Sequence, residues 1–306
     1  MNGRIVKALS GFYYVRTDTG NIYECRAKGA FRNEGEEPLV GDSVVFNVTD
    51  ARARTGIINQ IDPRKNRLIR PSVANVDQVL VIFAVRNPTP NLSVLDKFLV
   101  LMRRQNIPAI VVFNKKDLQK GEDIKNLKKT YKNAGCKIMF RTFGGPNRDS
   151  KYKMIFIKRL LRGKVTVLTG PSGTGKSTFI NLLAGNDDTE EGQVATVGAI
   201  SGKVGRGKQT TRHNEMYVFG RRDQYKVIDT PGFSSLLVTG SDFTRDELQY
   251  AFPEFAEYRG KCPFRDCKHI KERDCAVRAA AEEGKISLSR YNSYKSIYSD
   301  IKTQYK

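Results

Sequence analysis

The sequence lacks any apolar stretch approaching the ~20 residues that a membrane-spanning helix requires, which excludes an integral helical membrane protein. Its first ten residues lack the long apolar region of a secretory signal. Cysteine is scarce, with five in 306 residues, and without an export signal this favours reduced thiols or metal ligands over a disulfide framework. We therefore expect a cytoplasmic protein that has no membrane partner.

Acidic residues are also in deficit, because 32 Asp and Glu stand against 53 Lys and Arg, giving a net charge of +21. Residues 71–235 hold 28 basic and 13 acidic side chains, whereas residues 1–70 and 236–306 have net charges of only +4 and +2. This excess predicts a polyanionic partner, nucleic acid rather than an acidic membrane surface. The alternative is a charged surface that only keeps the protein in solution.

Residues 1–70 have the pattern of a small β-barrel. Short apolar or alternating runs separated by turn residues predict five strands, at 4–9, 11–16, 22–26, 43–48 and 56–61. An OB-type barrel fits this length and often binds RNA. Its aromatic residues, Phe12, Tyr13, Tyr14 and Phe31, could stack on bases or fill the core. A basic cluster of Arg64, Lys65, Arg67 and Arg70 is expected to form the linker that follows.

From residue 75 onward, strands and helices alternate. Nearly continuous apolar runs at 76–85 and 107–113 predict strands that are buried on both faces, and further strands are expected at 137–141, 164–168 and 225–228. Helical spacing of apolar residues predicts a helix at 92–105, and further helices are expected at 124–133, 152–161 and 177–184. This alternation is typical of a mainly parallel sheet covered by helices.

A phosphate-binding loop motif follows the strand at 164–168. The sequence Gly170-Pro171-Ser172-Gly173-Thr174-Gly175-Lys176-Ser177 fits G-x-x-x-x-G-K-[ST] between a strand and a helix. Lys176 should reach the β- and γ-phosphates of a nucleotide, and Ser177 should ligate Mg²⁺. The predicted phosphate contacts are Gly170, Ser172, Gly173, Thr174, Gly175, Lys176, Ser177 and Thr178.

Two further motifs point to guanine and to a nucleotide switch. Asn114-Lys115-Lys116-Asp117 closes the strand at 107–113, and a carboxylate there can accept the N1–H and N2–H₂ hydrogen bonds of guanine, which adenine lacks. Asn114 would support the loop, and Lys115 would lie on the base. Asp229-Thr230-Pro231-Gly232 follows the strand at 225–228, so that Asp229 would hold Mg²⁺ and Gly232 would sense the γ-phosphate.

The order of these motifs is unusual. In ordinary small GTPases the phosphate-binding loop precedes N-K-x-D, whereas here Asn114 precedes Gly170 by more than fifty residues. The same sheet can be threaded from a different starting strand when the affected loops are exposed. The sequence therefore predicts a circularly permuted GTPase domain over residues 71–235.

The long segment 186–213 is expected to carry the first switch. Thr210 or Thr211 would complete the Mg²⁺ site once a γ-phosphate is present, and the sequence does not decide between them. Phe233 stands where classical small GTPases have their catalytic Gln, and its side chain forms no hydrogen bond to water. We therefore assign water positioning to Gln209, with a bound nucleic-acid partner as the alternative, and name Gln209, Lys176 and Gly232 as catalytic candidates.

Residues 236–306 contain a metal-binding pattern among predicted helices. Cys262, Cys267, His269 and Cys275 form C-x₄-C-x-H-x₅-C, which predicts a closed structural Zn²⁺ site. Thr244 and Glu247 resemble a capping box. Leu288, Tyr291, Tyr294, Ile297 and Ile301 form an apolar stripe that predicts a docking face on a C-terminal helix. Cys25 and Cys136 are expected to be packed in apolar surroundings.

With these motifs in this order, the chain resembles the YjeQ/RsgA family of GTPases over essentially its whole length. The resemblance implies a bacterial GTPase that binds the 30S ribosomal subunit and 16S rRNA late in maturation and hydrolyses GTP to GDP. It implies GTP or GDP, Mg²⁺ and one structural Zn²⁺ as bound groups. The fold expected is multidomain α/β, with an OB-type barrel over 1–70, the permuted GTPase domain over 71–235 and an α-helical zinc-binding domain over 236–306. We expect a monomer.

The chain departs from the family pattern at two places. Gln209 stands where the family usually has a His thought to help position water, and Arg141-Thr142-Phe143 replaces the usual Ser-Ala of the guanine loop. Two alternatives to a ribosome-stimulated enzyme therefore stay open. One is an RNA-binding nucleotide switch with negligible turnover, and the other is a permuted GTPase that acts on the large subunit.

Overall fold

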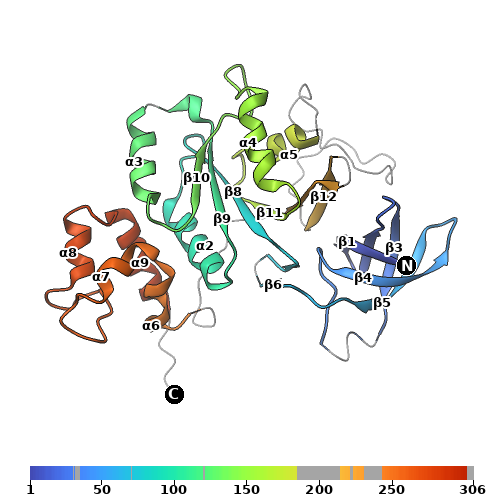
Figure 1. Cartoon of the computed structure of the whole chain (residues 1–306), viewed down its shortest axis with the longest axis horizontal. Helices are drawn as coiled ribbons and strands as arrows, with labels where there is room; N and C mark the ends of the chain where they lie inside the picture. Colours follow the sequence, from blue (N-terminus) through green and yellow to red (C-terminus); the bar gives the residue numbers. More distant parts are fainter. Residues whose placement is uncertain are drawn as a thin grey trace. The chain divides into compact units, whose positions relative to one another are not determined.

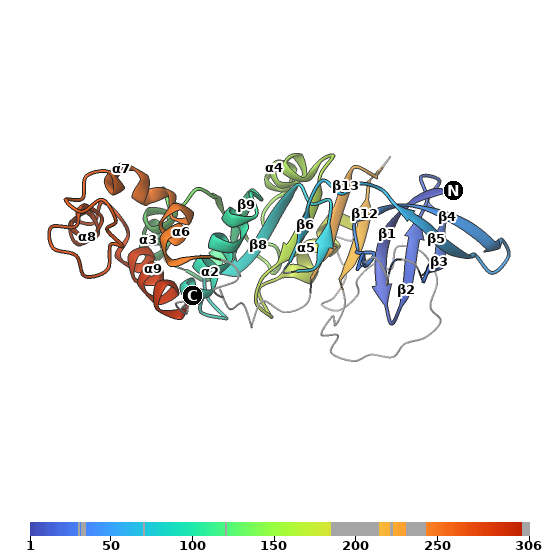
Figure 2. The same ribbon diagram turned by 90° about the horizontal axis from the view of Figure 1, so that it is seen from below.

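The computed structural model describes residues 1–29, 31, 35–69, 71–119, 121–184, 214–220, 223–230 and 243–301. The chain, drawn in Figures 1 and 2, forms two compact units. Each unit is built from three segments that alternate along the sequence with those of the other. The first unit comprises residues 1–80, 149–169 and 175–232, and the second comprises 81–148, 170–174 and 233–306. Among the described residues, no helix is both long and apolar enough to cross a membrane.

The first unit begins with a five-stranded barrel, as predicted. Its strands are β1 (Asn2–Leu9), β2 (Phe12–Arg16), β3 (Ile22–Ala27), β4 (Ser43–Asp50) and β5 (Thr55–Ile61). They pair in the order β1-β2-β3-β5-β4, and β4 pairs back with β1, so the sheet closes on itself and leaves few open edges. Alternate residues face inward, and Val15, Cys25 and Phe46 are among those fully buried.

The structure decides which of the predicted aromatic and basic residues of the barrel remain exposed. Tyr13 and Phe31 are buried in the core, so these two rings are not available to stack on bases, whereas Phe12 and Tyr14 remain partly exposed. Arg64 also does not serve as a free linker charge. It forms two hydrogen bonds of 2.8 and 2.7 Å to the fully buried carboxylate of Asp42, because a buried charge requires a partner.

The rest of the first unit is an α/β layer. Strands β11 (Val165–Thr169) and β13 (Tyr225–Asp229) are parallel, and β12 (Glu215–Phe219) runs antiparallel to β13. Helices α4 (Lys151–Leu161) and α5 (Lys176–Ala184) lie near the predicted positions. Strand β12 was not predicted. It pairs with β1 of the barrel at Glu215 and Lys7, whose charged groups lie 3.5 Å apart, so the barrel sheet continues into this layer.

The second unit contains the guanine-loop strands. Strand β8 (Gln78–Ala84) enters it at Val81 and neighbours β9 (Ala109–Asn114), which is parallel to β10 (Lys137–Phe140). Helices α2 (Leu92–Arg104) and α3 (Gly121–Tyr131) and the short helix η1 (Lys116–Leu118) connect these strands. Every side chain of β8 is buried, which explains its continuous apolar sequence.

Helices complete the second unit. They are α6 (Arg245–Leu248), η3 (Gln249–Ala251), η4 (Pro253–Phe255), α7 (Ala256–Arg259), α8 (Ala276–Glu282) and α9 (Leu288–Asp300). The capping box of Thr244 and Glu247 is present at the start of α6. The predicted apolar stripe of α9 is buried against neighbouring elements, α2 among them, except for Leu288, which is 55% exposed.

A buried ion network joins α9 to α2. Arg290 is almost fully buried and donates hydrogen bonds of 2.8 Å to Asp96 and 2.7 Å to Glu254. Tyr131, at the end of α3, also donates a hydrogen bond to Asp96, at 2.9 Å. Since removing one member would leave an uncompensated buried charge, this network holds α9 in one position.

Candidate nucleotide and metal site

Asn114 ends β9 and connects two loops of the second unit. Its side-chain amide donates to the carbonyl of Thr174 in the phosphate-binding loop at 2.8 Å. Its Oδ1 accepts from the backbone N–H of Phe143, in the loop after β10, at 2.9 Å. Asn114 is almost fully buried, and its two hydrogen bonds hold these loops together.

The two predicted guanine-contacting residues beyond Asn114 differ in their surroundings. Lys115 has a left-handed φ of +59°, and its ammonium donates to the carbonyl of Asn87. Asp117 lies in the first turn of η1 and is exposed, and it makes no hydrogen bond or ion pair with another described residue. Its carboxylate therefore has its full acceptor capacity available for a ligand.

The phosphate-binding loop takes backbone conformations that favour glycine. Gly170 has a φ of +143°, and a Cβ on it would lie 2.1 Å from the carbonyl oxygen of Ile82. Any larger residue would therefore collide with β8. The hydroxyl of Thr174 donates to the carbonyl of Pro171 at 2.9 Å, which closes the turn from within.

In the first unit, Asp229 is the last residue of β13 and interacts with Lys176, Thr230 and Glu215. Asp229 is 7% exposed, and its Oδ1 has no hydrogen-bond partner among the described residues. Burial raises the pKa of this carboxyl to about 6; Lys176 and the N–H of Thr230 oppose the rise, and Glu215, directly opposite in β12, adds to it. Burial also lowers the pKa of Lys176.

An orphaned buried carboxylate oxygen beside a lysine fits a hydrated divalent cation. Mg²⁺ prefers oxygen ligands and keeps several waters, so one carboxylate and one hydroxyl suffice from the protein. Asp229 could supply the carboxylate, and Ser177, exposed in the first turn of α5, could supply the hydroxyl. The predicted residues Gln209, Thr210, Thr211 and Gly232 lie outside the described residues, as does Phe233.

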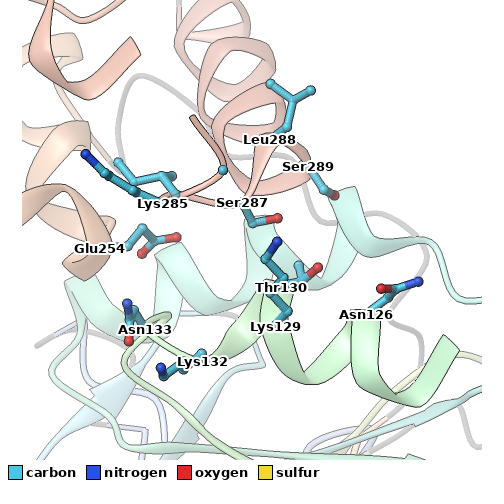
Figure 3. Close-up of a pocket in the computed structure, with 12 residues that line it drawn as sticks. Asn126, Lys129, Thr130, Lys132, Asn133, Glu254, Lys285, Ser287, Leu288 and Ser289 are labelled. Atoms are coloured by element: carbon cyan, nitrogen blue, oxygen red, sulfur yellow. The ribbon is translucent and has the colours of Figure 1, made fainter. Parts of the chain in front are cut away.

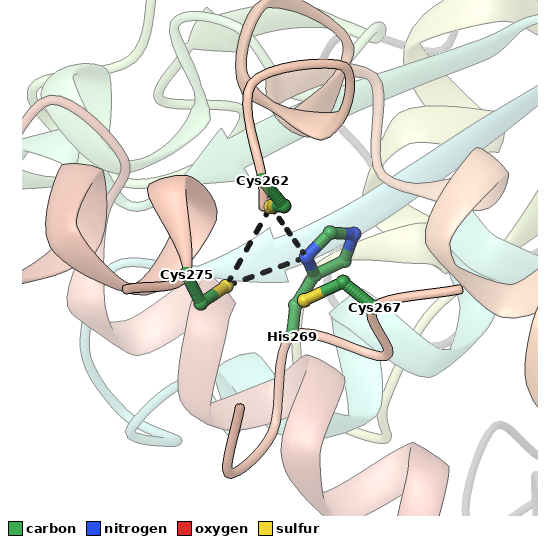
Figure 4. A group of neighbouring side chains, drawn as sticks. All are labelled: Cys262, Cys267, His269 and Cys275. Carbon is green, nitrogen blue, oxygen red and sulfur yellow. Dashed lines mark hydrogen bonds between the residues drawn. The ribbon is translucent and has the colours of Figure 1, made fainter. Parts of the chain in front are cut away.

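The four predicted zinc ligands converge in the second unit (Figure 4). Their ligand atoms all lie within 4.8 Å of one another. Cys262 Sγ and Cys275 Sγ are 4.0 Å apart, and His269 Nδ1 is 3.6 and 3.4 Å from them. Tetrahedral Zn²⁺ with Zn–S bonds of ~2.3 Å places two sulfurs ~3.8 Å apart, so the cluster fits this ion.

Residues around the cluster orient its ligands, and sequence reasoning did not find them. Gln249 Oε1 lies 3.0 Å from His269 Nε2, which places the ring proton there and leaves Nδ1 facing the sulfurs. Tyr291 donates to the carbonyl of His269 at 2.8 Å. Glu272 accepts the backbone N–H groups of Lys268, Ile270 and Lys271 at 2.8 to 3.0 Å. Gln249 lies twenty residues before the histidine, so no local motif marks it.

The sequence is similar to known proteins in both of its first two predicted domains. A family model described as RsgA GTPase matches residues 61–239, and one described as RsgA N-terminal domain matches residues 2–58. Proteins named small ribosomal subunit biogenesis GTPase RsgA are 43% identical in Agathobacter rectalis, over all of both chains, and 43% identical in Clostridium perfringens, over 96% of each.

Solved structures of similar proteins cover the same length. The crystal structure of YloQ, described as a circularly permuted GTPase, has a TM-score of 0.71 and 33% identity over 100% of this chain and 96% of that one. YjeQ from Thermotoga maritima has a TM-score of 0.73 and 30% identity over 98% and 97%. The fold class and the family resemblance predicted from the sequence are both confirmed. The chain belongs to the RsgA family of GTPases.

Proposed function

We propose that this protein binds the 30S ribosomal subunit through 16S rRNA late in subunit maturation, and that the ribosome stimulates its hydrolysis of GTP to GDP and phosphate. The observation that carries the proposal is similarity along the whole chain to proteins named for small ribosomal subunit biogenesis, barrel and C-terminal helices included. A net charge of +21 supports an RNA partner. We further propose a monomer that acts in the cytoplasm.

The site residues have the following proposed roles. Asn114, Lys115 and Asp117 bind guanine, and residues 170–178 bind the phosphates through backbone N–H groups and Lys176. Ser177, Asp229 and either Thr210 or Thr211 hold Mg²⁺, which when bound neutralises charge on the phosphate oxygens. Gly232 senses the γ-phosphate, and Gln209 orients the attacking water. Cys262, Cys267, His269 and Cys275 hold Zn²⁺.

The three-domain division is also a proposal, with boundaries at 1–70, 71–235 and 236–306. The two family models, which end at residue 58 and begin at residue 61, support a boundary close to the end of the barrel. Strand β6 (Arg67–Leu68) pairs with β7 (Val73–Ala74) across the proposed boundary at residue 70. This short ribbon would therefore limit bending between the barrel and the GTPase domain.

Purified small subunits are expected to raise the rate of GTP hydrolysis by about tenfold or more, because phosphoryl transfer depends on positioned groups that a partner can order. The measurement is phosphate release with no addition, with 30S subunits and with 50S subunits. Stimulation by 50S subunits alone would contradict the proposal. Nucleotide-dependent 30S binding without any turnover would favour the second candidate function, an RNA-binding nucleotide switch. Phe233, which stands where a catalytic Gln is usual, is the observation that favours this candidate.

Asp229→Asn is expected to stabilise the nucleotide-free protein while abolishing Mg²⁺-dependent hydrolysis. The folded chain holds the Asp229 proton more tightly than the unfolded chain, since its pKa rises from 3.8 to about 6. Stability that this proton contributes is present below pH 4 and lost as the pH rises through 6. At pH 8 the ionised carboxylate therefore costs about 3 kcal/mol, at 1.36 kcal/mol per pKa unit, and an amide avoids this cost.

Thermal unfolding at pH 8 in buffer without Mg²⁺ or chelator measures this effect, and Asp77→Asn is the matched control in the same unit. Burial alone would raise the pKa of Asp77, but hydrogen bonds from Lys65 and from the N–H of Val165 outweigh it and the pKa is lowered. The control should therefore lower the melting temperature where Asp229→Asn raises it. A nucleotide-free Asp229→Asn protein less stable than the wild type would contradict the claim that burial of the ionised Asp229 carboxylate destabilises the fold.

A further inference from the structure

A cavity of about 510 Å³ lies between helix α3 and the segment that leads into α9, within the second unit (Figure 3). Lysines from both sides and several hydroxyl and amide side chains line it. None of its lining residues belongs to the nucleotide motifs or to the zinc cluster. It therefore has no role in the GTPase site described above.

Three lysines bring positive charge to this cavity, and two of them have no ion-pair partner among the described residues. The lysines that line it are Lys129, Lys132 and Lys285. The Lys129 ammonium crosses to the far wall and stands 4.0 Å from where a Cβ on Gly284 would lie. Neither Lys129 nor Lys132 has an ion-pair partner among the described residues, and the pair of Lys285 with Glu283 is exposed.

The carboxylate that lines the cavity does not balance these lysines. Glu254 accepts hydrogen bonds from Arg290 at 2.7 and 3.3 Å, so its charge is already compensated from the other side. Like charges gathered around a cavity repel one another unless an anion enters. Neutral donors for the oxygens of such an anion come from Ser287, the N-cap of α9, from Ser289 in its first turn, from Asn126 on α3 and from Asn133 just beyond the end of α3.

The charge continues beyond the cavity along α3. Lys125 and Lys129 are spaced i and i+4, which places them on one face of α3, and Lys132 follows the last residue of the helix, Tyr131. All three lysines are exposed. A single small anion would engage the cavity and leave Lys125 unused. A chain of phosphates can engage the whole row.

We propose that the α3–α9 cavity and the adjoining row of lysines bind the phosphodiester backbone of RNA. This proposal rests on the proposed function, because it names a surface of the second unit that would hold the rRNA. Phosphate contacts position a protein on RNA without reading its sequence, so this surface supplies affinity and orientation.

The test compares Lys129→Gln/Lys132→Gln with Lys137→Gln/Lys295→Gln, which removes two exposed charges from the same unit outside the cavity. Affinity for 30S subunits and for naked 16S rRNA is measured against salt concentration. Each lost phosphate contact should lower the slope of log affinity against log salt by ~0.7 to 0.9. The cavity variant is expected to lose a slope of about 1 to 2 and about tenfold in affinity at 0.1 M salt, with zinc content and GTP affinity unchanged. The control should keep the wild-type slope.

A cavity variant with the slope of its control would overturn this inference and leave the proposed function intact. Wild-type protein that bound neither subunits nor 16S rRNA would contradict both. Titration with inorganic phosphate distinguishes a free phosphate ion from the phosphodiester backbone of RNA as the ligand. Submillimolar phosphate binding that is lost in the cavity variant, with RNA binding unchanged, would make the cavity a small-anion site and overturn the RNA assignment.

Discussion

Asp117→Asn is expected to replace the guanine preference of this GTPase with a xanthine preference. The exposed carboxylate of Asp117 has no partner among the described residues, so its two oxygens are free to accept the N1–H and N2–H₂ donors of guanine. An asparagine amide opposes one of these donors with its own N–H₂ group, whereas xanthine presents a carbonyl there. GTP affinity should fall by about 10³-fold or more, and XTP should bind in its place.

Competition of GTP and XTP for a labelled guanine nucleotide measures this exchange. Asp123→Asn is the matched control, because Asp123 is an exposed carboxylate in the first turn of the neighbouring helix α3. The control should keep the preference of the wild type. Unchanged discrimination against XTP in Asp117→Asn would remove this loop from the guanine site.

Cys267→Ala is expected to abolish zinc binding and to unfold the loop between residues 260 and 275. Purified wild-type protein should hold about one Zn²⁺ per chain. Burial raises the pKa of Cys267 to about 12 when no metal is bound, so the loop gains little from its thiols alone. Because structural zinc contributes on the order of 10 kcal/mol to its folded site, its loss should exceed the effect of ordinary surface substitutions.

The unfolding should nevertheless stay local. Helix α9 is held to α2 by the buried network of Arg290, Asp96 and Glu254, which contains no zinc ligand. Metal analysis and limited proteolysis should therefore show zinc loss and new cleavage within 260–275, with GTP affinity retained. Cys136→Ala, a cysteine outside the cluster in the same unit, should keep the metal. A wild-type protein without zinc, or full zinc content in Cys267→Ala, would contradict the assignment.

Local sequence patterns predicted the elements whose residues interact with near neighbours. The alternation in residues 1–70 predicted all five barrel strands because the strand period of two is set by backbone geometry. The continuous apolar run in β8 and the glycines of residues 170–175 likewise reflect local constraints, burial on two faces and backbone approach at Gly170. Strand β12 was missed although it is as long as β11 and β13, because its pairing with β1 and with β13 joins segments that no local spacing connects.

The sequence by itself determined the family, the permuted motif order and the four metal-binding side chains, since each is written in the spacing of residues close along the chain. Tertiary structure alone decided what surrounds them. Gln249 meets His269, Arg290 meets Asp96 across 194 residues, and Lys129 faces Gly284, because folding brings together positions that no spacing rule connects. Burial, which raises the pKa of Asp229 and removes Tyr13 and Phe31 from the barrel surface, is a property of the packed chain as a whole.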